Sequence, residues 1–401
     1  MGEFVHTVTT MPMARRPGCP FDPPPELLDA RRHGPISRYT FPGEKLGWLV
    51  TGFDLVRSVL ADARFSARRE LQLHPTVDLT GIEVAPPPPG EFLLTDRPQH
   101  SRYRKPLAGK FTVRRMRMLT EHIEQITADH LDAMEKAGPP VDLVTAFAKP
   151  IPAIVICELL GVPDRDRGFF QRQIDSIVSG ETPDEDLIAA YTMTQEYLAE
   201  LVAAKRADPT DDVLSDLTES DLTDEELRGV AITLLAAGFD TSANVLALGT
   251  FALLRNPSQL AALRADPGLA DSAVEELLRY VSVGKTFTRT ALEDVELGGQ
   301  TIEAGTTVIL SYNTANHDPE RFPDPHALDL GRNDGGNLAF GHGVHLCLGN
   351  QLARIELRAA FTALVKRFPT LRLAVPADEI PLRPETADIH GVKCLPVAWD
   401  T

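Results

Sequence analysis

The sequence predicts a mainly α-helical protein with a minor β part. Apolar residues recur at helical spacing over several segments of helical length, which is the primary signal for helices. Strand patterns are fewer and shorter, and they gather in the last third of the chain. No internal repeat and no long Gly/Ser linker divides the 401 residues, so we expect a single domain over residues 1–401, with an irregular N-terminal extension over residues 1–30.

Local signals predict the individual elements. Periodic apolar residues predict helices at about 114–136, 150–161, 185–205, 224–255, 270–281 and 348–368. Short runs rich in β-branched residues predict hairpin strands at TFTRT, at VELGGQTIEAGTTVILS with its Gly298-Gly299 turn, and at LRLAV and CLPVAW near the C-terminus.

The helix at 224–255 has the strongest signals. Thr223 followed by Glu226 predicts a capping box at its start, and Asn256-Pro257 predicts its end. Thirty-two residues at ~1.5 Å each span roughly 48 Å. Apolar residues lie on every side of its middle, so we expect this helix to be buried in the core.

The middle of the same helix reads AAGFDTSAN, which is unusual for a core. Gly238 costs about 1 kcal/mol relative to Ala in a helix, and Asp240 and Thr241 bring polar groups into an apolar setting. One interpretation is a loosely packed kink in which Thr241 bonds back to a backbone carbonyl. The other is a catalytic groove built into a core helix.

Composition and charge exclude some classes of protein. An apolar content of 43% with 24% charged residues is typical of a globular protein. The formal net charge of −17 argues against a general nucleic-acid binder, which needs a basic surface. The most apolar segment, residues 230–254, is interrupted by Asp240 and Asn244, which favours a buried helix over a membrane span.

Cysteine usage indicates a reducing compartment. The four cysteines are far apart and form no CxxC motif, so a disulfide framework is not expected. The N-terminal stretch has no apolar run long enough for a signal peptide or an anchor. We therefore expect a soluble, cytoplasmic protein. The cysteines are Cys19, Cys157, Cys347 and Cys394.

The stretch FGHGVHLCLG, residues 340–349, places Cys347 among glycines and histidines. A structural zinc site would need paired ligands, and no second pair exists. A plain core thiol explains Cys157 but not the glycines around Cys347. A thiolate ligand explains both features, because glycines let amides approach the sulfur and a helix start just after it favours negative charge and should lower the thiol pKa. Such a cysteine suits an axial haem ligand.

Four motifs in the same order resemble those of the cytochrome P450 family, and of its soluble bacterial members in particular. FGHGVHLCLG matches the haem-binding signature, AGFDT (Ala237 to Thr241) is similar to the oxygen-activation motif, EELLR carries a Glu-x-x-Arg pair, and TDRPQHSRYRKPL carries a His-x-x-x-Arg pair. The resemblance covers the chain from about residue 30 onwards. It implies the P450 fold, in which haem lies between the long central helix and the helix that follows the cysteine loop.

The resemblance also implies roles for individual residues. Cys347 would be the proximal thiolate on the iron of haem b, and Asp240 and Thr241 would deliver protons for catalysis. Cationic partners suit buried propionates, and structural support would come from an ion-pair network. The propionate partners would be His100, Arg104, Arg289 and His345, the further haem contacts Phe340, Gly341, Gly349 and Ala237, and the network Glu276, Arg279 and Arg332.

The same resemblance implies a monooxygenase that uses O2 and external electron donors, namely ferredoxin and ferredoxin reductase. The run RYRKPLAGKFTVRRMR, residues 102–117, carries seven Lys/Arg and no acid, which indicates either a solvated helix face or a docking surface for an acidic ferredoxin.

By family analogy, residues 66–92, 169–190, 283–288, 386–392 and the central helix would surround a bulky, mainly hydrophobic substrate. A tailoring hydroxylation of a natural product such as a polyketide, macrolide or terpenoid is expected, with epoxidation or oxidative aryl coupling by the same haem as alternatives. A non-catalytic haem sensor and a zinc-binding interaction module are the alternatives from other classes.

Overall fold

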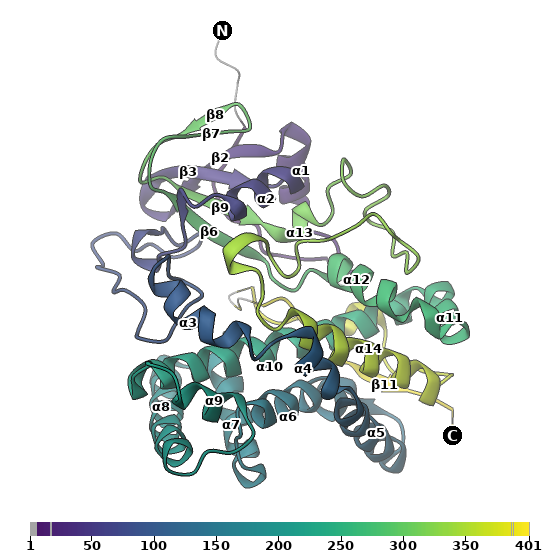
Figure 1. The fold of residues 1–401 in the computed structure, drawn as a ribbon. Helices are drawn as coiled ribbons and strands as arrows, with labels where there is room; N and C mark the ends of the chain where they lie inside the picture. Colours follow the sequence, from purple (N-terminus) through teal and green to yellow (C-terminus); the bar gives the residue numbers. More distant parts are fainter. Residues whose placement is uncertain (1–5, 17, 386, 388, 401) are drawn as a thin grey trace.

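The long helix α10, Asp224–Arg255, crosses the helical part of the protein, which lies below the sheet in the view of Figure 1. The structure is a computed structural model and describes residues 6–16, 18–385, 387 and 389–400. Its bounds are those predicted. The Thr223 hydroxyl accepts from the Glu226 amide at 3.2 Å, and the Glu226 carboxylate accepts from the Thr223 amide at 2.9 Å. α10 is long and apolar enough to cross a membrane, but 78% of its apolar window is buried inside the protein, as expected for a core helix.

Five helices build the core around α10. α6 (Pro150–Leu159), α8 (Asp184–Ala207), α12 (Ala270–Val281) and α14 (Asn350–Arg367) pack directly on it, and α5 (Thr120–Ala137) packs on α14. Their buried apolar side chains join one large cluster that runs from Phe21 to Trp399. α6, α8, α12 and α14 were each predicted within two residues of their observed ends.

The remaining helices are shorter or lie at the periphery (Figure 1). They are α1 (Pro25–His33), α2 (Phe53–Ala61), α3 (Gln99–Ala108), α4 (Val113–Met118), α7 (Asp164–Val178), α9 (Val213–Thr218), α11 (Pro257–Ala265) and α13 (Tyr312–Ala315). The helix predicted at 114–136 is in fact two helices, α4 and α5, because Thr112 caps a separate first helix that ends before Thr120.

A six-stranded sheet forms the β part, with the strand order β1-β2-β3-β9-β6-β4. Its strands are β1 (Thr7–Val8), β2 (Ile36–Phe41), β3 (Lys45–Val50), β4 (Phe65–Ser66), β6 (Thr286–Ala291) and β9 (Thr307–Ser311). A second sheet has the order β10-β11-β5, from β10 (Arg372–Leu373), β11 (Pro396–Ala398) and β5 (Val141–Asp142).

The Gly298-Gly299 turn joins a separate hairpin of β7 (Val295–Leu297) and β8 (Gln300–Ile302), as predicted. Both glycines have positive φ, 57° and 77°, which favours glycine in this tight turn. The strand TVILS does not belong to this hairpin. It is β9, which pairs in parallel with β3 and antiparallel with β6, so it lies inside the larger sheet.

The N-terminal segment is irregular for much of its described length but is packed against the core. Arg15 is buried and donates to the Pro20 and Phe21 carbonyls, both at 3.1 Å, and Phe21 packs on Phe251 and Tyr280. Regular helix α1 already begins at residue 25, inside the segment expected to be irregular. Residues 1–5 of that segment lie outside the described residues.

Candidate functional site

Cys347 lies at the end of a tight loop, three residues before the start of α14 at Asn350. Its amide donates to the Phe340 carbonyl at 2.9 Å, and the Asn350 side chain donates to the Cys347 carbonyl at 2.6 Å. Gly343 has a φ of +72°, and a Cβ there would lie 2.3 Å from the Leu60 carbonyl oxygen. A glycine is therefore required for α2 to pack against this loop.

The Cys347 thiol lies in a largely desolvated place. Burial raises its pKa, while the Gly349 amide and the guanidinium groups of Arg104 and Arg354 act in the opposite direction. The expectation of a lowered thiol pKa was therefore wrong in its net direction, because desolvation outweighs the local donors. These donors nevertheless surround the sulfur with positive potential, which suits a thiolate bound to a metal.

Phe340 and Gly341 are the first residues of the cysteine loop. The Phe340 ring is covered by the Arg354 guanidinium, 4.6 Å from the ring centroid, and Arg354 in turn pairs with Glu275 at 2.5 Å. Gly341 has a φ of +70°. These contacts fix the entry to the cysteine loop against α12 and α14.

Four basic side chains from three segments converge beside Cys347. The His100 and His345 rings lie 4.3 Å apart. Arg104 donates to the Leu346 carbonyl, and Arg289 donates to the Thr288 carbonyl at 2.7 Å. Four residues predicted as propionate partners are thus brought together from α3, β6 and the cysteine loop.

Positive charge in this cluster is not balanced by the protein. Burial and Arg104 lower the pKa of His100 to about 4, and burial and Arg289 lower the pKa of His345 to about 3. Among the described residues neither Arg104 nor Arg289 forms an ion pair, and the buried His100 Nε2 has no hydrogen-bond partner. Asp96 is the one carboxylate that acts on His100 and Arg289, and it is bound to Ser66 and to the Ala67 amide. Buried cations need anionic partners, so these residues fit a cofactor that brings carboxylates into the site.

α10 has an opening on one side. From residue 229 to 253 its described residues are buried except 236, 237, 238 and 241. Gly238 lets α6 approach, since a Cβ there would lie 2.9 Å from Ile156 Cδ1. The Thr241 hydroxyl donates to the Ala237 carbonyl at 2.7 Å. The back-bonded threonine of the first interpretation is therefore present, but α10 is continuous and has no kink at Gly238. The catalytic groove of the second interpretation stays a prediction.

Asp240 is held by groups that the sequence analysis missed. Arg383 donates to both Asp240 carboxylate oxygens at 2.8 Å, and the Asn244 amide donates to Oδ1 at 2.9 Å. Burial raises the Asp240 pKa, and the Arg383 charge opposes that shift. No local signal connects Arg383 with Asp240, because 143 positions separate them.

A second buried acid lies behind α10. Glu356 of α14 is 2% exposed and is hydrogen-bonded to Ser242, and burial raises its pKa to about 8. Glu356 is therefore protonated at neutral pH. Its position in the periodic segment that forms α14 predicted only a helix, so its burial could not be read from the sequence.

The predicted support network is present. Arg279 donates to Glu276 at 2.7 and 2.8 Å, and Arg332 donates to Glu276 at 3.2 Å. Arg279 also donates to the Asn316 and Pro325 carbonyls at 2.8 and 2.9 Å. The network thus fixes the long segment that leads from α13 to the cysteine loop.

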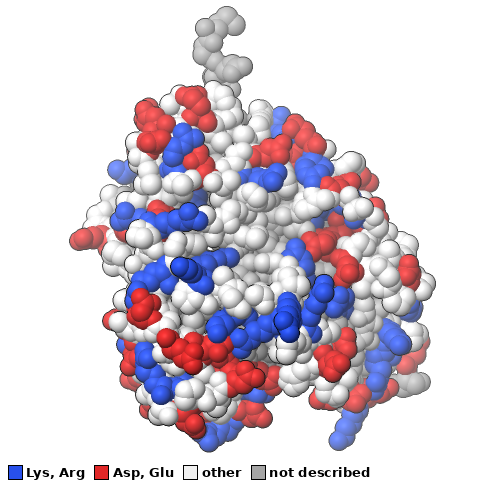
Figure 2. All heavy atoms as spheres, viewed as in Figure 1, with Lys and Arg blue, Asp and Glu red and all other residues white. Residues whose placement is uncertain are grey.

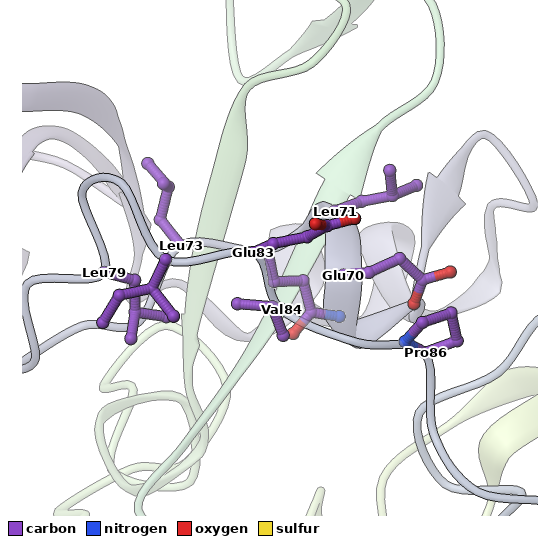
Figure 3. Close-up of a pocket in the computed structure, with 9 residues that line it drawn as sticks. Glu70, Leu71, Leu73, Leu79, Glu83, Val84 and Pro86 are labelled. Carbon is purple, nitrogen blue, oxygen red and sulfur yellow. The ribbon is translucent and has the colours of Figure 1, made fainter.

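The loop between β4 and α3 contains a surface hollow of about 490 Å³ (Figure 3). The loop is anchored to the sheet, where the Leu73 amide donates to Thr307 at 3.1 Å and Thr290 donates to the Leu71 carbonyl at 2.9 Å. No residue of α10 or of the cysteine loop lines it, so it is an outer part of the segment 66–92. The lining is Glu70, Leu71, Gln72, Leu73, Leu79, Ile82, Glu83, Val84 and Pro86.

The zinc alternative receives no support from the geometry. Among the described residues, the groups of three histidine, cysteine or acidic side chains that could share a metal do not include His342, His345 or Cys347. A partly buried cysteine, basic groups beside it that lack ion-pair partners in the described part of the chain, and a core helix with a local opening instead fit a protein that binds an anionic metal cofactor.

Comparisons with known proteins identify the family. A model of the family described as "Cytochrome P450" matches residues 185–267 and 268–389. "Cytochrome P450 105C1" from Streptomyces sp is 49% identical over 382 residues, covering 94% of this chain and 96% of the relative. "Pentalenic acid synthase" from Streptomyces avermitilis is 42% identical and covers 99% of both chains. The chain belongs to the cytochrome P450 family, a family of haem-thiolate oxidoreductases.

Solved structures confirm the predicted fold. The crystal structure of CYP105P1 in complex with filipin I superposes with a TM-score of 0.91 at 41% identity, covering 98% of this chain and 99% of that one. The crystal structure of GfsF gives a TM-score of 0.90 at 40% identity, with coverage of 98% and 100%.

Replacing Cys347 by alanine should abolish the thiolate-type absorption of the reduced, carbon-monoxide-bound protein, because this sulfur is the one that the loop amides and Arg104 surround. Cys157→Ala and Cys394→Ala serve as controls and should leave the spectrum unchanged. A full carbon-monoxide signature in Cys347→Ala would disprove the assignment of this ligand.

Glu356→Gln should remove a pH-dependent cost to stability. The unfolded chain ionises this carboxyl near 4.5, whereas the folded pKa is about 8. Between pH 4.5 and pH 8 Glu356 is protonated in the folded state and ionised in the unfolded state. The free energy of unfolding therefore falls as the pH rises through this range. The variant should therefore gain up to a few kcal/mol relative to wild type at pH 8 and nothing at pH 4. Denaturant unfolding of both proteins at the two pH values is the measurement, and an equal difference at both would contradict it.

Proposed function

We propose that this protein is a monooxygenase that inserts one oxygen atom of O2 into a bulky, mainly hydrophobic small molecule, as a tailoring hydroxylation of a natural product. The observation that carries the proposal is the opening at Ala237 and Thr241 in an otherwise buried helix of a chain that also presents Cys347. The names of relatives support the substrate class: a pentalenic acid synthase, a "Nocardicin C N-oxygenase" and a "Cytochrome P450 monooxygenase PikC" each match more than 90% of this chain.

The cofactor in this proposal is haem b. Cys347 would hold its iron, His100, Arg104, Arg289 and His345 would neutralise its two propionates, and the cofactor would supply the oxidising chemistry. Phe340, Gly341, Gly349 and Ala237 would complete the contacts. The unbalanced charge of the basic cluster supports this role, since the cluster gains most from an anionic ligand.

Proton supply would fall to α10. Thr241 lies in the opening, and its hydroxyl can exchange the Ala237 carbonyl for another acceptor by rotation about χ1. Asp240 is the residue before it in the sequence. Its carboxylate can pass a proton only while at least one of its two oxygens is not hydrogen-bonded to Arg383. Arg383 would therefore be a positioning residue that decides how often Asp240 is available. Buried apolar residues on the rest of α10 would keep bulk water out.

Electrons would come from a ferredoxin and its reductase. Figure 2 shows Lys and Arg gathered in a band across the middle of one face, over α3, α4 and the start of α14, in a protein of net charge −17. Within residues 102–117, several basic groups are already paired internally: Arg102 with Glu226 at 2.7 Å, and Arg115 with Asp216 at 2.7 Å. The exposed members, Lys105, Arg114 and Arg117, are the ones left to attract an acidic partner.

A single domain over residues 1–401 and a cytoplasmic location complete the proposal. The widely spaced, free cysteines support a reducing compartment.

Thr241→Ala should uncouple electron use from product formation. Loss of the hydroxyl leaves haem binding intact but removes a proton donor, so the product formed per reductant consumed should fall by on the order of tenfold or more. Thr233→Ala is a matched control, because Thr233 makes the same back bond to Gly229 at 2.8 Å on the buried side of the same helix. Coupling at the wild-type ratio in Thr241→Ala would contradict a proton role for this hydroxyl.

Asp240→Asn should slow turnover rather than only uncouple it, since an amide cannot carry a proton as a carboxylic acid does. Arg383→Gln should change the pH dependence of turnover, because the charge that opposes the raised pKa of Asp240 would be removed. A pH profile of Arg383→Gln that superimposes on that of wild type would refute the positioning role.

The double substitution of Arg114 and Arg117 by Glu should weaken reduction by an acidic ferredoxin and flatten its salt dependence, because screening acts on exposed charge. Peroxide-driven turnover, which needs no donor protein, should be unchanged. Arg32→Glu with Lys45→Glu carries the same charge change near the sheet and should leave reduction unaffected. Equal losses in the ferredoxin and peroxide assays would show damage to the fold instead of docking.

A further inference from the structure

Asp22, His317 and His326 form a cluster outside the haem site. One ring nitrogen of each histidine and one Asp22 carboxylate oxygen all lie within 4.8 Å of one another. His326 Nδ1 is hydrogen-bonded to Asp22 Oδ1 at 2.7 Å. Asp22 belongs to the N-terminal segment before α1, whereas the histidines follow α13, so the cluster joins parts of the chain that are about 300 residues apart.

The ion pair between His326 and Asp22 does not account for the position of His317 in the cluster. Its side chain is buried, with the residue only 1% exposed. Nδ1 lies 2.8 Å from the Asn313 carbonyl oxygen, which can only accept, so this nitrogen carries the proton. Nε2 then presents a lone pair, yet it is buried and has no hydrogen-bond partner among the described residues. A backbone carbonyl that fixes the tautomer in this way is the usual support of a metal-binding histidine.

We propose that His317, His326 and Asp22 bind a divalent transition-metal ion of the Zn²⁺ type, with a fourth position left for water. Two imidazoles and one carboxylate are ligands that suit this ion. Ligand atoms about 2.0–2.2 Å from tetrahedral zinc lie about 3.3 Å from one another, so the cluster must contract. Asp22 and His326 can move, since their side chains are 27% and 45% exposed, while buried His317 stays fixed.

Charges around the cluster permit a cation. Arg279 lies close enough to His317 to lower its pKa, but its charge is balanced by Glu276 at 2.7 Å. Two arginines act on Asp22: Arg16, which is exposed, and Arg15, which is buried. The Arg15 guanidinium is held by the carbonyls of Pro20, Phe21 and Ser282, to which it donates at 3.1, 3.1 and 3.3 Å. A metal bound at His326 Nδ1 would take the place of the hydrogen bond to Asp22, and the Asp22 carboxylate would offset one of the two charges of the ion.

A second histidine cluster, His6, Asp29 and His33, supplies the comparison. Its two rings stack at 4.3 Å with an interplanar angle of 7°, and both its histidines contact solvent. It contains no buried nitrogen without a partner among the described residues. The same residue types therefore occur there without the feature that points to a ligand.

The metal would tie the N-terminal segment to the loop that Arg279 holds. Arg15 and Phe21 already dock this segment against α10 and α12, and a shared ion at Asp22 would fasten its end. The expected result is a stability gain that depends on metal concentration, because a ligand that binds only the folded state stabilises it.

The test is calorimetric titration of chelator-treated holoenzyme with Zn²⁺, followed by thermal unfolding with and without the ion. Wild type should bind one equivalent and unfold at a higher temperature with zinc. Asp22→Asn and His326→Gln, both at partly exposed positions, should each bind at least tenfold more weakly and lose the thermal shift. His317→Ala should do the same, with its carbon-monoxide spectrum as the check on folding.

His33→Gln is the control and should bind zinc as wild type does. Loss of the equivalent in His33→Gln, with retention in Asp22→Asn and His326→Gln, would place the metal at the other cluster and overturn the proposal. Absence of stoichiometric binding to wild type would overturn it as well.

Discussion

The buried ion pair between Glu276 and Arg279 is the interaction on which the rest of the site depends. Both side chains are at most 2% exposed, and the guanidinium also holds the carbonyls of Asn316 and Pro325. Removing either partner of such a pair costs about 3–5 kcal/mol, because the other charge is left buried alone. The pair fixes a long segment without regular structure to α12, and the cysteine loop begins where that segment ends. The position of Cys347 thus depends on α12, a helix that is distant from it in the sequence.

The electrostatics of the protein divide into balanced and unbalanced regions. Around Glu276 every buried charge has a partner of opposite sign within hydrogen-bond distance. Beside Cys347 the reverse holds: burial lowers the pKa values of His100, His345, Arg104 and Arg289, neither arginine forms an ion pair among the described residues, and Asp96 is the one carboxylate that acts on His100 and Arg289. Folding tolerates such an arrangement only where a ligand completes it. The imbalance is therefore as informative about the cofactor as the motif itself.

Sequence analysis predicted what local chemistry determines. The bounds of α10 follow from the capping box at Thr223 and from Pro257, and the glycine-rich loop around Cys347 carries its own signal. Contacts between distant segments gave no such signal. The parallel pairing of β3 with β9, the bond from Arg383 to Asp240 and the burial of Glu356 all depend on tertiary packing. The direction of the Cys347 pKa was wrong for the same reason, because desolvation is a property of the whole fold.

The bond from Thr241 to the Ala237 carbonyl sets an order of events. A hydroxyl has one proton, and the Thr241 hydroxyl donates it to the Ala237 carbonyl. Toward the opening in α10 the side chain can therefore only accept a hydrogen bond. Donation into the site requires rotation about χ1, and the same rotation leaves the carbonyl without its donor. That carbonyl then attracts a water molecule from the opening. A single torsion angle therefore couples the release of a proton to the admission of the solvent that can replace it.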